Sequence, residues 1–427
     1  MKLLPAVVNH RYSLKLAGTV FLAVVVMDTL PATARTFTAN DFKSLSDAIN
    51  SANSTPGTNT IKLNSDITLS GLLPLINSDI DFVGKNHEIN GDGKYPGFFV
   101  NGVTVKFSHL TIKNTLAQGG NGGNGAGGGA GLGGGLFING GTVTVNKVTF
   151  SGDQVIGGIG GIGSSPRSVP YPFFAGGGGG IYGGNGGFGN ASGGGGLGAD
   201  GGNSLLGGDG GKGGGSSGGA GGSYIRSNMF FGQPGAAGDF GGGGGSGSIP
   251  GGVGGAGGFG GGGGAGGTGS AAGNGGGGGF GGGGSGESGG FGGFGGGDGG
   301  GRTVFSLPPG VIRGGFGGKS GPYTGGGGGA GLGGAIFVNS GSLNLKNCSF
   351  LDNSAQGGAG GAGGSSTGTP GQGKGGAIFI NTDATVTSIG KLTFSNNQAP
   401  DATGTETDND NVYGTIKLLA EPSEESN

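Results

Sequence analysis

Short runs in which apolar and polar residues alternate begin near residue 60 and recur, with one long interruption, to residue 415. The clearest early runs are Ile61-Lys62-Leu63, Ile67-Thr68-Leu69, Ile80-Asp81-Phe82 and Val103-Thr104-Val105-Lys106-Phe107. Alternation with period two is the pattern of a half-buried β-strand, because successive side chains point to opposite faces. Asn, Gly, Ser and Asp residues between the runs favour turns, so the pattern predicts many short strands.

Three of the later segments are copies of one another. They read GLFINGGTVTVNKVTF at 135–150, AIFVNSGSLNLKNCSF at 335–350 and AIFINTDATVTSIGKLTF at 377–394. The alignment matches Leu136 with Ile336 and Ile378, Asn139 with Asn339 and Asn381, Val148 with Cys348 and Leu392, and Phe150 with Phe350 and Phe394. No copy can bury its own apolar face, whereas stacked copies bury a continuous core. The repeat therefore predicts a solenoid.

One segment, residues 40–53, has the pattern of a helix. Its apolar residues recur at spacings of three and four, as a helical face requires: Phe42, Leu45, Ala48, Ile49 and Ala52. Asn40 or Ser44 can cap its start. A stack of strands needs covers at its two ends, so this helix is expected to cap the N-terminal end.

The segment LSDAINSANSTPGTNTIKL, at 45–63, resembles the start of bacterial surface proteins with a pectate-lyase-like β-helix, including polymorphic outer-membrane proteins and autotransporter passengers. The later order of an LTI strand, a glycine-rich linker, GGxIFxN and TFSxN is similar to theirs, and the likeness covers about 36–155 and 329–415. It implies an all-β, right-handed parallel β-helix solenoid with an N-terminal capping helix. The fold carries adhesins, lyases, hydrolases and stalks, so it leaves function open.

Glycine supplies 129 of the 427 residues, about three in ten against roughly 7% in average usage. Most of it lies in a long insertion at 157–328, with shorter stretches at 119–135 and 357–376. All three occur between strands of the repeat, so they are expected to project from one flank. This composition is compatible with two states of the insertion. One is a flexible linker, and the other is a set of packed polyglycine helices with three residues per turn.

Scattered aromatic residues distinguish the insertion from a plain linker. They can anchor packed glycine helices or contact a partner, and the candidate binding surface consists of Tyr182, Phe188, Phe230, Phe231, Phe259, Phe280, Phe291 and Phe294. Phe240 and Phe316 belong to the same set.

The N-terminus has the pattern of a secretory signal peptide. Lys2, Arg11 and Lys15 precede the apolar run Leu16–Met27, and Ala32-Thr33-Ala34 matches a cleavage site. The predicted organisation is a signal peptide at 1–34, β-helix at 35–156, the insertion at 157–328, further rungs at 329–415 and an acidic tail at 416–427. The mature chain is then expected to have no transmembrane segment and to be secreted, with association at the cell surface or outer membrane as an option.

Few residues are candidates for catalysis or metal binding. Asp79 and Asp81 share a strand face and Asp92 follows in a turn, which makes them the candidate metal ligands. A solvated edge and a turn aspartate explain the same residues. No catalytic motif or cofactor site is predicted. The single cysteine, Cys348, aligns with apolar residues and is expected to be buried.

With 21 Lys and Arg against 23 Asp and Glu, the chain shows no basic stripe for nucleic acid. The sequence therefore favours a structural or adhesive surface protein that contacts host cells or glycans through its glycine-rich part. A polysaccharide-active lyase or hydrolase on the same fold, and an autotransporter passenger without its β-barrel, are the alternatives.

Overall fold

The computed structural model describes residues 33–163, 176–188, 192–203, 211–215, 218–221, 233–240, 242–247, 252–266, 274–285, 290–300, 315–320, 325–363 and 366–420. The expected signal peptide, apart from its last two residues, and the last seven residues of the expected tail lie outside this set.

One helix and eighteen strands make up the regular structure of the described residues. They are β1 (Thr36–Ala39), α1 (Phe42–Asn53), β2 (Asn59–Leu63), β3 (Ile67–Thr68), β4 (Ile80–Val83), β5 (Glu88–Asn90), β6 (Phe98–Val100), β7 (Thr104–Lys113), β8 (Leu116–Gln118), β9 (Gly131–Leu132), β10 (Leu136–Ser151), β11 (Gln154–Ile156), β12 (Gly331–Leu332), β13 (Ile336–Leu351), β14 (Ser354–Gln356), β15 (Gly373–Lys374), β16 (Ile378–Ser395), β17 (Val412–Tyr413) and β18 (Ile416–Leu419). The last of these lies inside the segment expected as an acidic tail.

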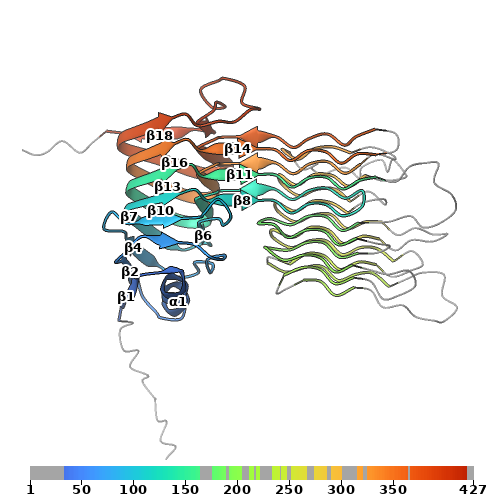
Figure 1. Cartoon of the computed structure of the whole chain (residues 1–427), viewed down its shortest axis with the longest axis horizontal. Coiled ribbons are helices and arrows are strands. Elements are labelled where there is room, and N and C mark those ends of the chain that lie inside the picture. The colour runs from blue at the N-terminus through green and yellow to red at the C-terminus, as the bar shows by residue number, and fades with distance from the viewer. Residues whose placement is uncertain are drawn as a thin grey trace, which may run out of the picture.

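Successive passes of the chain lie on top of one another, and we call this part the coil stack (Figure 1). Its main sheet has the order β1-β2-β4-β7-β10-β13-β16-β17, and two smaller sheets have the orders β14-β11-β8 and β15-β12-β9. Every pairing between named strands is parallel. The predicted all-β class with parallel strands is thus confirmed.

The register of the stack matches the alignment of the sequence repeat. Leu136 pairs with Ile336, which pairs with Ile378. Asn139 Nδ2 donates to Asn101 Oδ1 at 3.0 Å, and the Asn339 and Asn381 amides continue this ladder at 2.8 and 3.0 Å. A one-residue slip would turn every buried side chain outward, so the apolar pattern and the amide ladder define the same register.

Aromatic and aliphatic side chains fill the interior of the stack. The rings of Phe150, Phe350 and Phe394 lie above one another with centroids 5.3 and 5.1 Å apart, which is a favourable stacking distance. Cys348 is 1% exposed beside them, as predicted, and burial raises the pKa of its thiol.

Helix α1 buries Leu45, Ala48, Ile49 and Ala52 against the stack and contacts β1 and β2, as expected of a cap. The predicted capping residue was wrong. Asp41 is the N-cap, and its carboxylate accepts from Ser44 N at 2.7 Å while the Ser44 hydroxyl accepts from Asp41 N at 3.0 Å. Ser44 is the third helical residue of a capping box, whose second partner here is a serine in place of glutamate.

The glycine-rich segments leave the stack at one corner. They follow β8, β11 and β14, which are neighbours in one sheet, and they return through β9, β12 and β15, which are neighbours in another. Their described residues run side by side as extended segments on one flank of the stack, as predicted (Figure 1). We call the described parts of 119–130, 157–330 and 357–372 the glycine block.

Backbone hydrogen bonds in the glycine block point in three directions. The consecutive N–H groups of Gly127, Gly128 and Gly129 donate to carbonyls of three different segments, at 2.8, 3.0 and 2.8 Å. Gly262, Gly263 and Gly264 repeat this arrangement at 2.7, 3.0 and 2.9 Å. A strand pairs with neighbours on only two sides, so the block is not an ordinary sheet.

A buried polar ladder joins consecutive turns of the stack. Thr115, Asp153, Asn353 and Asn397 occupy the same turn in successive passes. Asn353 and Asn397 accept a backbone N–H from the preceding pass and donate Nδ2–H to the carbonyls of Phe150 and Phe350. Asp153 Oδ1 accepts from Thr115 N and Oγ1, but its Oδ2 is buried with no hydrogen-bond partner among the described residues. Burial raises the pKa of Asp153 to about 8.

We expect Asp153→Asn to stabilise the protein at neutral pH. The folded state binds the carboxyl proton of Asp153 more tightly than the unfolded state, in which the pKa is near 4. The stabilisation of the folded state by this proton is therefore complete below pH 4 and is lost as pH rises towards 8. An asparagine at 153 does not titrate, so this pH dependence disappears. It also has an Nδ2–H donor, like those that Asn353 and Asn397 direct to backbone carbonyls. The expected gain is about 1–3 kcal/mol at pH 7.5.

Thermal unfolding followed by circular dichroism at pH 5 and pH 8 measures this. The wild-type melting temperature should drop more between the two values than that of Asp153→Asn. Equal drops for the two proteins would show that Asp153 does not carry the proton.

Candidate functional site

The three candidate metal ligands do not meet. Asp79 Oδ1 accepts from Thr104 N at 2.8 Å, and Asp81 lies 3.5 Å from Lys106 Nζ at the start of β7. Asp92 follows β5, which pairs with the far end of β7, and it contacts Lys94 Nζ at 2.8 Å. Among the described residues no three His, Cys, Asp or Glu side chains gather closely enough to hold a metal ion.

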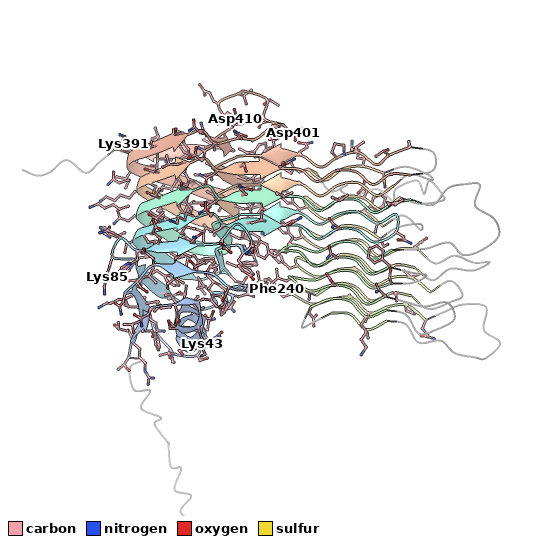
Figure 2. The ribbon with its side chains drawn as sticks, viewed as in Figure 1. Lys43, Lys85, Phe240, Lys391, Asp401 and Asp410 are labelled. Atoms are coloured by element: carbon pink, nitrogen blue, oxygen red, sulfur yellow. The ribbon has the colours of Figure 1, made fainter. Side chains whose placement is uncertain are left out.

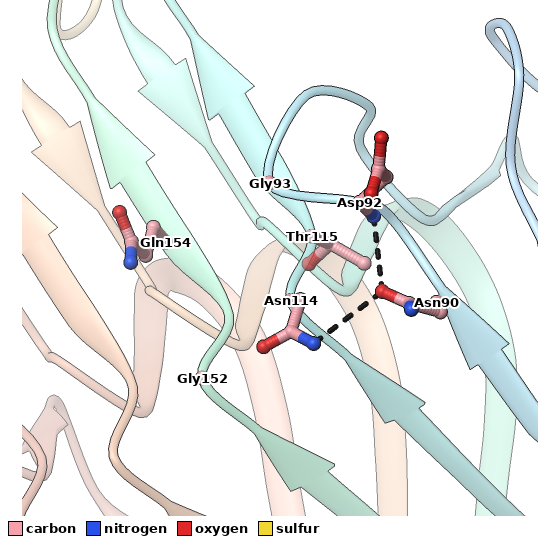
Figure 3. Close-up of a pocket in the computed structure, with 7 residues that line it drawn as sticks. All are labelled: Asn90, Asp92, Gly93, Asn114, Thr115, Gly152 and Gln154. Carbon is pink, nitrogen blue, oxygen red and sulfur yellow. Dashed lines mark hydrogen bonds between the residues drawn. The ribbon is translucent and has the colours of Figure 1, made fainter.

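Asp92 lies at the edge of a shallow hollow of about 300 Å³ (Figure 3). Asn90 lines the same hollow, and its Oδ1 accepts from Asp92 N at 3.0 Å and from Asn114 Nδ2 at 3.4 Å. The Asp92 carboxylate already pairs with Lys94 at 2.8 Å, so no free carboxylate faces the hollow from this turn. The hollow has the character of a solvated turn.

Most of the described aromatic side chains of the insertion lie where the glycine block meets the coil stack. Phe240, which Figure 2 marks at this junction, begins a row that continues through Phe259, Phe280 and Phe294, with centroids 4.9, 5.0 and 5.0 Å apart. A second row on the stack consists of Phe99, Phe137, Phe337, Phe379 and Tyr413. Phe316, 5.6 Å from Phe294, extends the first row. The rows face each other, with ring centroids between 5.2 and 6.5 Å apart. We call the two rows the aromatic layer.

Tight turns of the glycine block place the rings of this layer. Gly261 N donates to Gly258 O at 2.9 Å, which leaves Phe259 and Gly260 at the centre of the turn. The φ of Gly260 is +78°, a value that a type II turn requires at its third residue and that favours glycine. The same geometry recurs at Phe280-Gly281 and Phe294-Gly295.

The predicted binding residues thus occupy different places. Phe259, Phe280 and Phe294 belong to the aromatic layer, and Tyr182 lies beside it, where its hydroxyl donates to Leu132 O at 3.2 Å and burial raises its pKa. Phe188 is 56% exposed, and Phe291 is half-buried. Phe230 and Phe231 lie outside the described residues.

Phe188 and two isoleucines that the sequence did not single out lie on segments to either side of the Asn121 segment. Ile159 N donates to Asn121 Oδ1, Asn121 N to Asn185 Oδ1 and Asn185 N to Asp200 Oδ1, at 2.9, 2.9 and 2.7 Å. Ile162 and Phe188 each follow a member of this row by three residues. We call this surface, formed by Asn121, Ile159, Ile162, Asn185 and Phe188, the Ile–Asn face.

The Ile–Asn face exposes large apolar side chains on a backbone that neighbouring segments hold in place. Ile159, Ile162 and Phe188 are 50%, 72% and 56% exposed. The sequence signal is the triplet pattern GGNGGN at 119–124 and GGIGGI at 157–162, in which every third residue carries the side chain. Both runs directly follow equivalent strands, β8 and β11, but no pattern in the sequence indicates that the segment of Phe188 lies beside the Asn121 run.

No family model, curated protein or solved structure matches the chain. In the part of the chain that the structure covers, no helix has the length and apolar character needed to cross a membrane.

The packing of the glycine block gives a direct test. A Cβ on Gly262 would lie 2.0 Å from the carbonyl oxygen of Gly178, whereas a Cβ on Gly315 would meet nothing within 4 Å. We expect Gly262→Ala to force neighbouring segments apart, at about 1–3 kcal/mol, and Gly315→Ala to leave them in place.

Hydrogen–deuterium exchange measured by mass spectrometry reports the result. Peptides from 176–200 and 252–285 should exchange faster in Gly262→Ala than in Gly315→Ala, while peptides from the coil stack should not change. Unchanged exchange of the block peptides would contradict the close backbone contact.

Proposed function

We propose that this chain is a secreted surface protein that binds a partner through the Ile–Asn face. Its coil stack would be a right-handed parallel β-helix, and its glycine block a bundle of polyglycine helices that presents the face. The observation that carries the proposal is the exposure of Ile159, Ile162 and Phe188 on segments that hydrogen bonds through Asn121 and Asn185 join. Exposed apolar side chains that gather on one surface are typical of contact sites.

Hydrogen bonding in three directions supports the polyglycine assignment. A polyglycine helix has three residues per turn, so its consecutive N–H groups point about 120° apart and reach three neighbours. Residues three apart then point the same way, which accounts for Ile159 and Ile162 sharing a face. Neighbouring segments hold these helices on the sides away from the Ile–Asn face, so little entropy remains to be lost when a partner binds.

The charge of the chain supports contact by apolar and polar groups. The net charge is −2, and the Ile–Asn face carries amide and apolar side chains. The proposed export rests on the signal-peptide pattern of the N-terminus, and it would place the face in contact with other cells.

Cell-binding measurements test the proposal. We expect the triple variant Ile159→Ser, Ile162→Ser and Phe188→Ser to bind cultured epithelial cells at least about fivefold less than wild type, because each apolar contact contributes on the order of 1 kcal/mol or more. Val253→Ser is the matched control, since Val253 is 48% exposed on a segment with no hydrogen bond to the Ile–Asn face.

Flow cytometry with labelled purified protein gives the comparison. Loss of binding in the triple variant alone supports the Ile–Asn face as the contact site. Equal binding by wild type and the triple variant, or no binding by wild type, would overturn the proposal.

A further inference from the structure

A second hollow lies at the C-terminal end of the coil stack. The segment between β16 and β17 forms the loop that rises above β18 in Figure 1, and Figure 2 marks Asp401 and Asp410 in it. This loop, the first part of β16 and residues 413–415 line an open space of about 560 Å³, which we call the threonine hollow. Sites for small molecules occupy roughly 300–1,000 Å³.

Threonine is the most frequent residue in the wall of the threonine hollow. The described residues that line it include five threonines, Thr382, Thr403, Thr405, Thr407 and Thr415, and the amide of Asn381. Thr382, Thr405 and Thr407 are exposed. A hydroxyl both donates and accepts a hydrogen bond, so such a wall matches ligands that also carry both functions.

Backbone hydrogen bonds hold the wall in shape. Thr405 N donates to Asp408 O at 3.0 Å, Asn409 N to Val412 O at 3.0 Å and Gly414 N to Thr407 O at 2.8 Å. The loop is therefore a small hydrogen-bonded hairpin that needs little ordering when a ligand enters.

A buried ion pair helps to hold the wall of the hollow. Asp408 is 9% exposed, and its Oδ2 accepts from Lys374 Nζ at 2.6 Å and from Thr403 Oγ1 at 2.9 Å. Its Oδ1 is closed to solvent, so a ligand in the hollow does not reach it. Through Thr403 the pair fixes the loop, so the hollow keeps its shape without a ligand.

The charge of the hollow disfavours charged ligands. Asp408 is the one charged residue among the described residues that line it, and Lys374 already neutralises it. An anion would meet the carboxylate, and a cation would compete with Lys374 for it. A neutral ligand with many hydroxyl groups matches the threonine hydroxyls and brings no charge into the hollow.

We infer that the threonine hollow binds a short uncharged oligosaccharide. This site is separate from the Ile–Asn face and does not depend on the function proposed for that face. Hydroxyl groups of the sugar exchange hydrogen bonds with Thr405, Thr407 and Asn381. The hollow is open and polar, so binding is weak and gains strength from several copies of the protein on one surface.

Titration calorimetry of the full-length protein tests the inference. The probes are short neutral oligosaccharides of β-1,4-linked glucose, α-1,4-linked glucose, β-1,4-linked xylose and α-linked mannose. We expect at least one to bind with a Kd of roughly 1 mM or lower. The double variant Thr405→Val and Thr407→Val, which keeps side-chain shape and removes two hydroxyls, should raise that Kd about tenfold.

Thr385→Val is the matched control, because Thr385 is exposed on β16 and does not line the hollow. It should bind as wild type does. Absence of binding to all four probes, or equal binding by the double variant, would overturn the inference. The triple variant of the Ile–Asn face should retain oligosaccharide binding, so failure of either proposal can be told from failure of the other.

Discussion

Close approach of backbones is the constraint on which the glycine block depends. A Cβ added to Gly128 would lie 2.1 Å from the carbonyl oxygen of Gly158, and one added to Gly179 would lie 1.9 Å from that of Gly120. Contacts below 3.0 Å do not occur for real side chains, so these positions admit only glycine. Glycine loses much conformational entropy on folding, and satisfied backbone hydrogen bonds on three sides are what offset that loss.

The aromatic layer connects this block to a part of the molecule with opposite chemistry. The coil stack folds by burying apolar side chains, whereas the glycine block has few to bury. Phe259 and its neighbours supply the missing apolar surface at one edge of the block, against Phe137 and Phe337 of the stack. The stack thus gives the block a fixed edge from which its segments extend.

Much of the coil stack could be predicted because its signals are local or repeated. Alternation gave the strands, and the repeat gave the pairing of Leu136, Ile336 and Ile378, since equivalent residues of stacked copies become neighbours. The N-cap was missed because Asn40, Asp41 and Ser44 all suit that role. Asp153 was missed because its environment comes from Asn353, which is 200 residues away in the sequence.

The candidate site was harder to predict. The aromatic residues of the insertion were recognised, but whether a ring faces the stack or solvent depends on which glycine segments are neighbours. Identical triplets carry no information about that choice. The threonine hollow likewise depends on a loop closing over β16, and its threonines are scattered over 382–415 without a spacing that identifies them.

The corner at which all three glycine-rich segments leave the coil stack has a consequence for how such a protein can change. The stacked amides of Asn101, Asn139, Asn339 and Asn381 are 38, 200 and 42 residues apart in the sequence, yet they pair in one register. The register of the coils is therefore the same whether a short or a long segment connects them. A duplicated pair of glycine segments would bring its own turn and phenylalanine, so the block can be lengthened or shortened in whole units while the rest of the molecule is inherited unchanged.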